Sequence, residues 1–258
     1  MKIGLFIKYE VVPQNFEKEM IDKIIDRGHL FDNENPDYVF VFGGDGTFLK
    51  SVQKYLNRIS DIKFVCFNKG KLAYFSDFNE GEVDYVLSSL DKDEFLISSH
   101  SLLCAKMKDE TLYGLNEIRI ENPFRTLMSE VYVDDTYLET FRGNGLVVCT
   151  SFGSSAYNKS LSGACVSIDL EVMQLNEIAP INNCLYASLR SPLILPKCSS
   201  ITFKGEFKDV VIGYDNQIKK DSHSNEINFF LSEKKVNLVF KKNHNYIDKL
   251  SKSFVSRR

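Results

Sequence analysis

Apolar and polar positions alternate along the first third of the chain in a way that predicts strands followed by helices. Ile3 to Ile7 form a compact apolar run and Tyr38 to Phe42 an uninterrupted one, and both favour buried strands. Between them, Asn15 to Asp26 carry apolar residues at helical spacing, and Gly28 stands where such a helix would end. A second helix is predicted at Phe48 to Leu56. The chain therefore begins with an α/β pattern.

This alternation continues to about residue 96, with a strand predicted at Ile62 to Phe67 and a helix at Glu82 to Leu90. The remainder looks mostly β, and Asp134-Asp135 suit a tight hairpin turn. Its predicted strands are Ser98 to Met107, Leu112 to Ile120, Ser129 to Tyr137, Gly145 to Thr150, Ile201 to Phe203 and Val210 to Ile212. Two exceptions are a short helix predicted at Ile168 to Ile178 and a tail after Phe240 that predicts a strand end plus a helix.

Composition narrows the class of protein. With 258 residues, 43% of them hydrophobic, the chain can bury a core and divide into two modest domains. A net charge of −3 argues against nucleic acid as a partner. The six cysteines form no C-x-x-C pair, and no window approaches eighteen apolar residues, so we expect no membrane association and a reducing, cytoplasmic setting.

The first candidate site is Gly43-Gly44-Asp45-Gly46-Thr47, directly after a predicted buried strand. Glycines let the backbone approach an anionic ligand, and the following helix would point its N-terminal amides toward phosphate. Asp45 would then bind the magnesium that accompanies ATP or accept the proton of a substrate hydroxyl. A plain strand-to-helix turn with a capping aspartate is the alternative.

Two further polar segments follow strands. Asn68-Lys69-Gly70-Lys71-Leu72 would bring amides and cations to the same sheet edge, although a solvated basic turn has the same composition. Asn116-Glu117 lies in a strand-like stretch, where an amide and a carboxylate could read ribose hydroxyls or an adenine edge, or simply continue ordinary alternation.

The richest segment runs from Phe141-Arg142-Gly143-Asn144-Gly145-Leu146 through a short apolar strand into Thr150 to Ser160. Its hydroxyls and glycines suit a tight polar wall, Ser155 and Ser160 can bind sugar or amide groups, and Tyr157 offers a face for stacking on a base. A Ser/Gly linker is the alternative, but the apolar strands around the segment argue against it.

At these residues the chain resembles the NAD kinase family over nearly its full length. That family carries, in order, a GGDGT loop, an N-x-G-x-L-G-F segment, an N-E pair, an F-R-G-D-G-L stretch and a T-P-T/S-G-S-T-A-Y run, and the sequence has a recognisable form of each. The resemblance implies transfer of a phosphoryl group from ATP, or polyphosphate, to the 2′-hydroxyl of the adenosine ribose of NAD, with Mg²⁺ or another divalent cation.

The resemblance also implies site residues. Asp45 is the catalytic carboxylate by this comparison. The residues expected to bind NAD or ATP are Gly43, Gly44, Gly46, Thr47, Lys50, Asn68, Asn116, Glu117, Arg142, Asn144, Ser155, Ala156, Tyr157, Ser160, Ala179 and Gln217. No protein residue is expected as a dedicated metal ligand. The implied assembly is a homodimer or homotetramer in which a neighbouring subunit completes the NAD pocket near Ala179.

The implied fold has an N-terminal Rossmann-like α/β domain over residues 1–96 and a C-terminal β-sandwich over 97–235. A tail at 236–258 is expected to return to the first domain. Departures from the family pattern are Asn144 in place of Asp, Ser151-Phe152 in place of Pro-Thr or Pro-Ser, Ser155 in place of Thr, and Ala73-Tyr74-Phe75, which lacks the glycine before Phe. Asn144 keeps a hydrogen-bonding side chain but loses a charge, which predicts altered affinity rather than altered chemistry.

Two other functions remain open at this point. Lipid and sphingoid-base kinases resemble this chain in the GGDGT loop and the two-domain plan, although the Asn-Glu pair and the Gly-Ser-Ser-Ala-Tyr wall disfavour them. A non-catalytic NAD(P)-sensing protein is the second alternative, motivated by Asn144 and Ser151-Phe152.

Overall fold

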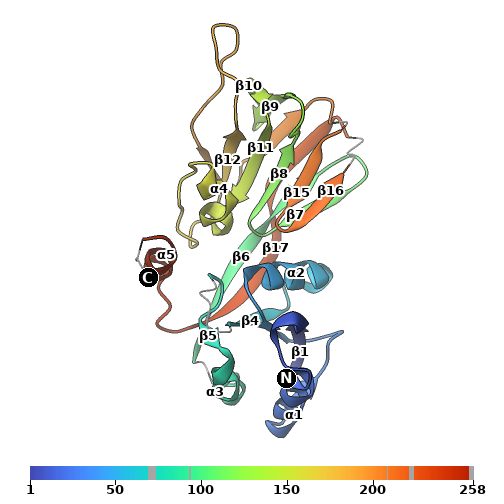
Figure 1. Ribbon diagram of the computed structural model, residues 1–258, viewed down its shortest axis with the longest axis vertical. Coiled ribbons are helices and arrows are strands. Elements are labelled where there is room, and N and C mark those ends of the chain that lie inside the picture. Colours follow the sequence, from blue (N-terminus) through green and yellow to red (C-terminus); the bar gives the residue numbers. More distant parts are fainter. Residues whose placement is uncertain (69–73, 93, 208, 221–223, 256–258) are drawn as a thin grey trace. The chain divides into compact units, whose positions relative to one another are not determined.

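The computed structural model describes residues 1–68, 74–92, 94–207, 209–220 and 224–255. They form two compact units, one of Met1–Ser99 with Lys235–Arg258 and one of His100–Lys234. The chain passes between the units within strands β6 (Phe95–Lys106) and β17 (Glu226–Lys241) (Figure 1). The domain boundaries expected from the sequence, 1–96, 97–235 and 236–258, stay a prediction.

The first unit is built on a parallel sheet in the order β2-β1-β3-β4-β17, with β5 beside β4. Its strands are β1 (Lys2–Ile7), β2 (Leu30–Phe31), β3 (Tyr38–Phe42), β4 (Lys63–Asn68), β5 (Phe78–Asn79) and the end of β17. Its helices are α1 (Phe16–Asp26), α2 (Asp45–Lys54), α3 (Val83–Ser89) and α5 (Tyr246–Phe254), with 3-10 turns at Tyr9–Val11, Leu56–Arg58 and Glu80–Glu82.

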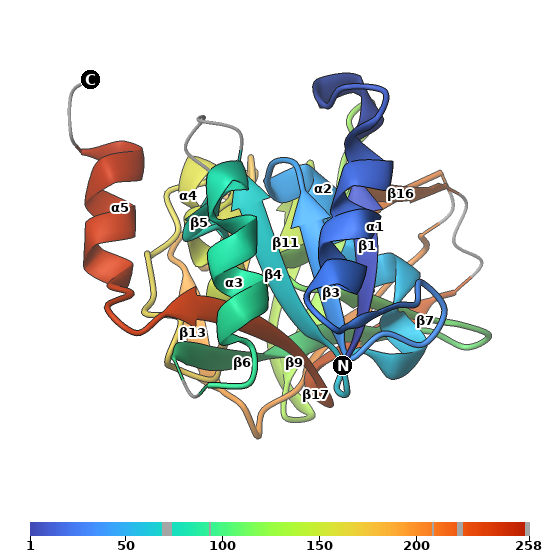
Figure 2. The same cartoon turned by 90° about the horizontal axis from the view of Figure 1, so that it is seen from below.

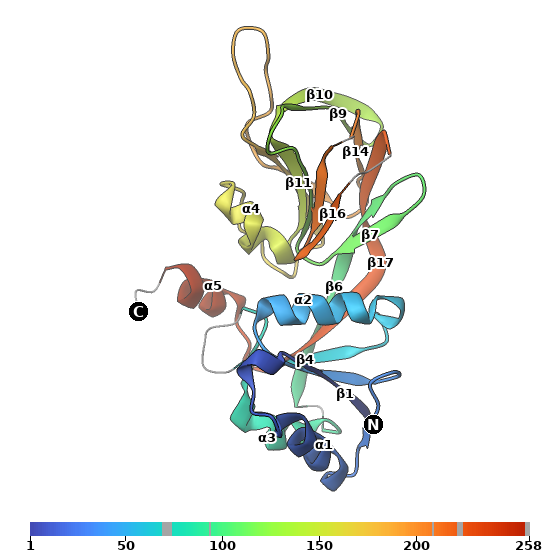
Figure 3. The same ribbon diagram turned by 45° about the vertical axis from the view of Figure 1, so that its right-hand side comes forward.

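Helices cover both faces of this sheet, which explains why its central strands are apolar throughout. Every residue of β3 is buried. Phe40 and Phe42 share a core with Phe16 of α1 and with residues of α3, whereas Phe64 contacts Phe48 of α2. Figures 2 and 3 show α1 and α3 on one side of the strands and α2 on the other. The predicted strand–helix alternation is confirmed.

Helix α2 begins three residues earlier than the predicted start at Phe48, which matters for the site. Gly44 is the residue that caps its N-terminus, and Asp45 lies in the first turn. An aspartate is favourable there because the helix dipole presents partial positive charge. The apolar pattern could not report this turn, because its residues are exposed or half-buried.

The second unit consists of two β-sheets packed around one core. One sheet has the order β13-β12-β11-β8-β15-β16, and the other contains β10-β9-β14-β17, with β6 pairing with β17 and β7. The strands not yet bounded are β7 (Thr111–Gly114), β8 (Glu117–Glu121), β9 (Leu127–Val133), β10 (Thr136–Gly143), β11 (Gly145–Thr150), β12 (Val172–Ile178), β13 (Leu193–Pro196), β14 (Ile201–Lys204), β15 (Val211–Tyr214) and β16 (Gln217–Lys220). Side chains from both sheets, including Ile118 and Phe229, fill the core.

The turn between β9 and β10 is the tight hairpin turn that the sequence predicts. Asp134 and Asp135 join β9 to β10 with φ of 47° and 62°, the backbone that a two-residue hairpin turn requires. The strand expected at Leu112 to Ile120 is divided into two. Its first part is β7, and its second part, β8, begins only after Asn116, where pairing with β11 and β15 starts.

The helix predicted at Ile168 to Ile178 is wrong, because Val172–Ile178 is strand β12, paired with β11 on one side and β13 on the other. Met173 and Leu175 face the core of the sandwich, while Gln174 and Asn176 are buried on the opposite face. Those two amides hydrogen-bond to Ala164 and Asn158. Because the polar residues Gln174 and Asn176 alternate with the apolar ones and are buried, the sequence pattern of β12 resembled a helix with one polar face.

Helix α4 (Tyr157–Ser160), preceded by a 3-10 turn at Phe152–Ser155, follows β11. The strand end and helix predicted after Phe240 are confirmed as the end of β17 and α5. Among the described residues, no helix combines the length and the apolar character that crossing a membrane requires.

Candidate active site

The glycine loop connects β3 to α2 in the first unit. Gly44 has extended backbone angles and space for a side chain, so it exposes its amide. Gly43 is different, because a Cβ there would lie 2.4 Å from Oγ1 of Thr47. The missing side chain at Gly43 therefore lets the first turn of α2 fold back onto the loop. Lys50 is exposed on α2, and Asn68 is the last residue of β4.

Asp45 is held by the backbone of a second loop. Its Oδ2 accepts the amide of Tyr74 and its Oδ1 accepts the amide of Phe75, each at 3.2 Å. Burial raises the pKa of Asp45, while the two amides and the charge of Lys249 act in the opposite direction. A carboxylate whose pKa is raised but which keeps two donors can accept a proton from a bound hydroxyl. Lys69 and Lys71, the cations predicted to lie at this sheet edge, are outside the described residues.

Asn116 and Glu117 stand at the start of β8 in the second unit. Asp215 binds this segment by accepting the amides of Leu115 at 2.8 Å and Asn116 at 2.7 Å. Both site residues are buried, yet Oδ1 of Asn116 and Oε2 of Glu117 have no hydrogen-bond partner among the described residues. Buried acceptors are rarely left unpaired, so these two atoms are able to accept hydroxyl or amide donors.

Glu117 has an unusual electrostatic environment. Burial first, and then the neighbouring Asp215, raise its pKa to about 8, whereas Arg119 lowers it. Nη1 of Arg119 lies 3.5 Å from Oε1 of Glu117, and its Nε donates to Glu121 at 2.9 Å. Burial therefore favours the protonated form of the Glu117 carboxyl.

The polar wall predicted at Thr150 to Ser160 folds against this pair. Gly153 packs on the backbone of Asn116, and Thr150 donates its amide to the Asn116 carbonyl at 2.9 Å. Ser155, Ala156 and Tyr157 are half-buried, while Ser160 is exposed. The turn is built tightly, so it is no linker.

Tyr157 lies next to Glu121 and Arg119. Its hydroxyl donates to Glu121 at 3.2 Å, and the guanidinium of Arg119 lies 4.8 Å from its ring centroid. Gly213 lies across from Arg119 on β15, where a Cβ would come within 2.9 Å of the guanidinium. Arg119 is thus seated between a glycine and an aromatic ring.

Sequence comparisons point to one family. A model of the ATP-NAD kinase C-terminal domain matches residues 115–240. The NAD kinase of Leuconostoc citreum is 32% identical, with 99% of this chain and 98% of that protein covered. The NAD kinase of Streptococcus thermophilus is 33% identical, with 86% and 82% covered. The chain belongs to the NAD kinase family.

Solved structures of similar proteins share the fold. An NAD kinase from Archaeoglobus fulgidus in complex with ATP superposes with a TM-score of 0.78 at 23% identity, covering 97% of both chains. Yeast NADH kinase complexed with NADH superposes with a TM-score of 0.84 at 21% identity, covering 100% of this chain and 89% of that one. The expected fold class, α/β followed by a β-sandwich, is confirmed.

A second group of expected residues lies together where β10 and β11 meet the end of β12. The amide of Asn144 donates to Ile178 at 3.0 Å, and the carbonyl of Arg142 accepts from Ile181 at 2.7 Å. Ala179, with φ of 45°, is part of the same turn. The guanidinium of Arg142 lies 4.4 Å from the ring of Tyr186. Gln217 starts β16 and pairs with Tyr214, which in turn pairs with Ile118 of β8, the residue after Glu117.

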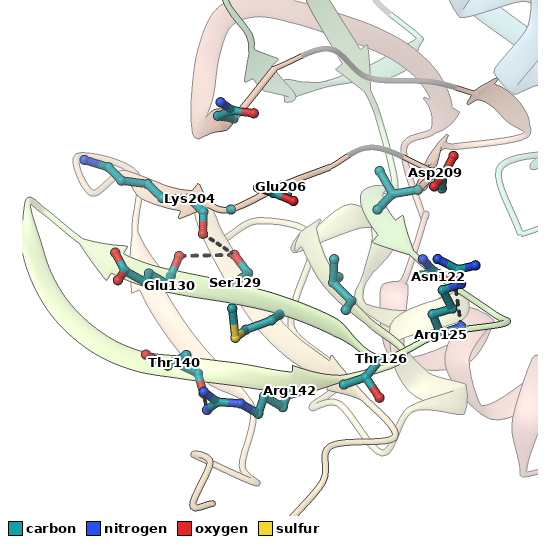
Figure 4. A pocket seen from close by; sticks show the side chains of 15 residues that line it. Asn122, Arg125, Thr126, Ser129, Glu130, Thr140, Arg142, Lys204, Glu206 and Asp209 are labelled. Carbon is teal, nitrogen blue, oxygen red and sulfur yellow. Dashed lines mark hydrogen bonds between the residues drawn. The ribbon is translucent and has the colours of Figure 1, made fainter.

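A cavity of about 800 Å³ in the second unit involves one of the expected NAD kinase site residues, Arg142 (Figure 4). Lys204 and Arg125 line it together with Glu206 and Asp209, so its charges are mixed. Among its lining residues, the hydroxyl of Ser129 donates to the carbonyl of Lys204. A second cavity of about 840 Å³ is lined by none of the expected residues, so cavity size does not single them out.

Three residues of this site were not singled out for their roles by the sequence. Arg119 follows Glu117 by two residues, so strand alternation could have placed both on one face. Asp215 and Lys249 carried no such local signal, because the groups they contact lie about 99 and 170 positions away along the chain.

Proposed function

We propose that this protein transfers the γ-phosphoryl group of ATP to the 2′-hydroxyl of the adenosine ribose of NAD, producing NADP. Its relatives named NAD kinase support the substrate and the reaction. The observation that carries the proposal is the Asp45 carboxylate, which stands in the first turn of α2 with both oxygens held by amides. That arrangement joins an oriented base to a glycine-rich helix N-terminus.

The proposed reaction is an in-line displacement. The 2′-oxygen attacks the γ-phosphorus, the bond from that phosphorus to the bridging oxygen breaks, and ADP leaves. Asp45 accepts the proton of the hydroxyl, and the amide of Gly44 at the N-terminus of α2 binds phosphate oxygens. Catalysis rests mainly on positioning, because the protein forms no covalent bond with the phosphoryl group.

Binding of NAD is assigned to the second unit. The unpaired acceptors of Asn116 and Glu117 would take hydrogen bonds from ribose hydroxyls, and a protonated Glu117 could also donate one. Ser155, Ala156 and Tyr157 form the adjoining wall. Further contacts are proposed for Lys50, Asn68, Arg142, Asn144, Ser160, Ala179 and Gln217.

A divalent cation, Mg²⁺ in the simplest case, is proposed to accompany ATP. When bound, it would neutralise charge on the triphosphate. Mg²⁺ prefers phosphate oxygens and water with few protein ligands. Among the described residues, no group of three or more His, Cys, Asp or Glu side chains could hold a metal ion.

We further propose a cytoplasmic homodimer or homotetramer. All six cysteines are free thiols, which suits a reducing compartment. The turn at Ala179 leads into a segment with exposed Leu185 and Tyr186, the kind of surface that a second copy could cover. Sedimentation of the purified protein would test the assembly.

The decisive test is a coupled assay. Purified protein is incubated with NAD, Mg²⁺ and either ATP or polyphosphate, and NADP is measured with an NADP-specific dehydrogenase. NADP formation with wild-type protein but not with Asp45→Asn is the expected result. Phosphorylation of diacylglycerol in place of NAD would favour a lipid kinase, and NAD binding without turnover would favour a sensor.

A further inference from the structure

The C-terminal helix α5 is attached to the first unit by very little apolar contact. None of its residues is buried, and Ile247 and Phe254 remain largely exposed. Rings of Tyr246 and Phe254 approach Tyr74, each with centroids 6.4 Å apart. A helix with so little buried apolar surface must be stabilised in its position by other interactions.

One polar side chain of α5 is well shielded from solvent. Lys249 donates through Nζ to the carbonyl of Ser76 and pairs with Oδ1 of Asp77 at 3.0 Å. The side chains of Lys249 and Asp77 are 16% and 9% exposed, so this ion pair is screened little by water. Removing one partner of such a pair leaves an uncompensated buried charge, which is costly.

Asp77 is the centre of this contact. Its other oxygen, Oδ2, lies 2.7 Å from Nδ1 of His244 and accepts the amide of Lys241 at 3.3 Å. Burial by itself would raise the pKa of Asp77, but His244 and Lys249 outweigh it and hold that pKa below its ordinary value. The carboxylate is therefore ionised and fully engaged by the C-terminal tail.

The residues bound by the tail continue directly from those that hold the catalytic carboxylate. Tyr74 and Phe75 donate their amides to Asp45, and Ser76 and Asp77 are the next two residues. The hydroxyl of Ser76 also lies 2.5 Å from the carbonyl of Cys66. One four-residue segment thus contacts Asp45 at its beginning and Lys249 at its end.

We propose that Lys249 is a positioning residue for Asp45, because it fixes the segment Tyr74–Asp77 whose amides orient the Asp45 carboxylate. Lys249 acts through this backbone, in addition to the effect of its charge on the pKa of Asp45, and not on the substrate. The C-terminal helix is then part of the catalytic apparatus, which explains why a poorly buried helix is held by a shielded ion pair. This inference rests on the proposed function, since it assumes that Asp45 is the catalytic group.

The experiment compares Lys249→Met, Lys249→Arg and a matched control, Lys252→Met, in the full chain. Lys252 is an exposed cation of the same helix. We expect Lys249→Met to lower kcat about 10-fold with KM for NAD nearly unchanged, since a misaligned catalytic group costs rate before binding. Lys249→Arg should recover most of kcat, and Lys252→Met should match wild type. Unchanged kcat in Lys249→Met would overturn the inference.

A double-mutant cycle tests the route through Asp45. If Lys249 acts through that carboxylate, Lys249→Met should lower the residual rate of Asp45→Asn no further, whereas additive losses would overturn the inference. NADP formation retained in Asp45→Asn would instead remove Asp45 from the mechanism, and no NADP formation by the wild-type protein would refute the proposed function, so these failures are distinguishable from one another. Should Lys249→Met fail to fold, Asp77→Asn is the second variant, and a kcat equal to wild type there would overturn the inference.

Discussion

Gly153 lies directly against Asn116, so closely that a Cβ built on Gly153 would be 2.0 Å from the Asn116 carbonyl oxygen. The same carbonyl accepts the amide of Thr150, and the amide of Asn116 is held by Asp215. The backbone of Asn116 is therefore fixed on both sides. This contact joins the polar wall to the Asn-Glu pair, two motifs that are separate in the sequence.

We expect Gly153→Ala to weaken both stability and NAD binding. The added methyl group meets backbone, which cannot rotate away, and overpacking of this kind costs about 1–3 kcal/mol. Thermal unfolding should shift down by about 2–4 °C for each kcal/mol, and KM for NAD should rise. Gly44→Ala is the stability control, because a Cβ there meets nothing within 4 Å. Equal unfolding midpoints for both variants would contradict the packing argument.

Asp45→Asn should remove the proton acceptor and leave the fold intact. The amide group keeps the size of the side chain, but its NH2 end cannot accept the amide of Tyr74 or Phe75, so the unfolding midpoint should fall modestly while the fold persists. Turnover should fall at least ~100-fold, the usual scale for losing an acid/base group. Binding of NAD, measured by calorimetry, should persist. Wild-type NADP formation by this variant would remove Asp45 from the mechanism.

Glu117 should make stability depend on pH. Because its folded-state pKa is raised to about 8, the folded protein holds this proton more tightly than the unfolded chain does. Its contribution is fully present below about pH 4.5 and is lost as pH rises toward 8 and beyond. Glu117→Gln should therefore unfold at a higher temperature than wild type at pH 9, by about 2–4 °C or more. Thermal melts at pH 6 and pH 9 check this, and parallel pH dependence of the two proteins would contradict it.

Arg119 should influence NAD affinity through its neighbours. It contacts Glu117, Glu121 and the ring of Tyr157, so Arg119→Met should raise KM for NAD about 5-fold, equivalent to about 1 kcal/mol. KM for ATP and kcat should change little, and Arg119→Lys should be intermediate because it keeps the charge but not the planar stack. Arg125→Met, at an exposed arginine of the same unit, is the control. A matching rise in KM for ATP would argue for general disruption.

Local patterns were sufficient where one short segment carries the whole signal. The apolar run of β3, the helical spacing of α1 and the aspartate pair of the β9–β10 turn each encode their structure within a few residues. The ordered motifs likewise identified the family, since glycines and paired polar residues are recognisable in sequence without any long-range contact.

Only the tertiary structure could decide features that depend on partners far along the chain. β12 is a strand because β11 and β13 supply its hydrogen bonds. On its second face, the side-chain amides of the buried Gln174 and Asn176 donate to Ala164 and Asn158, so the local polar pattern was misleading. Asp215 and Lys249 are joined to the site by contacts about 99 and 170 positions apart in sequence. Such contacts exist only once the chain has folded, since side-chain periodicity reports which face is buried and not which distant group will meet it.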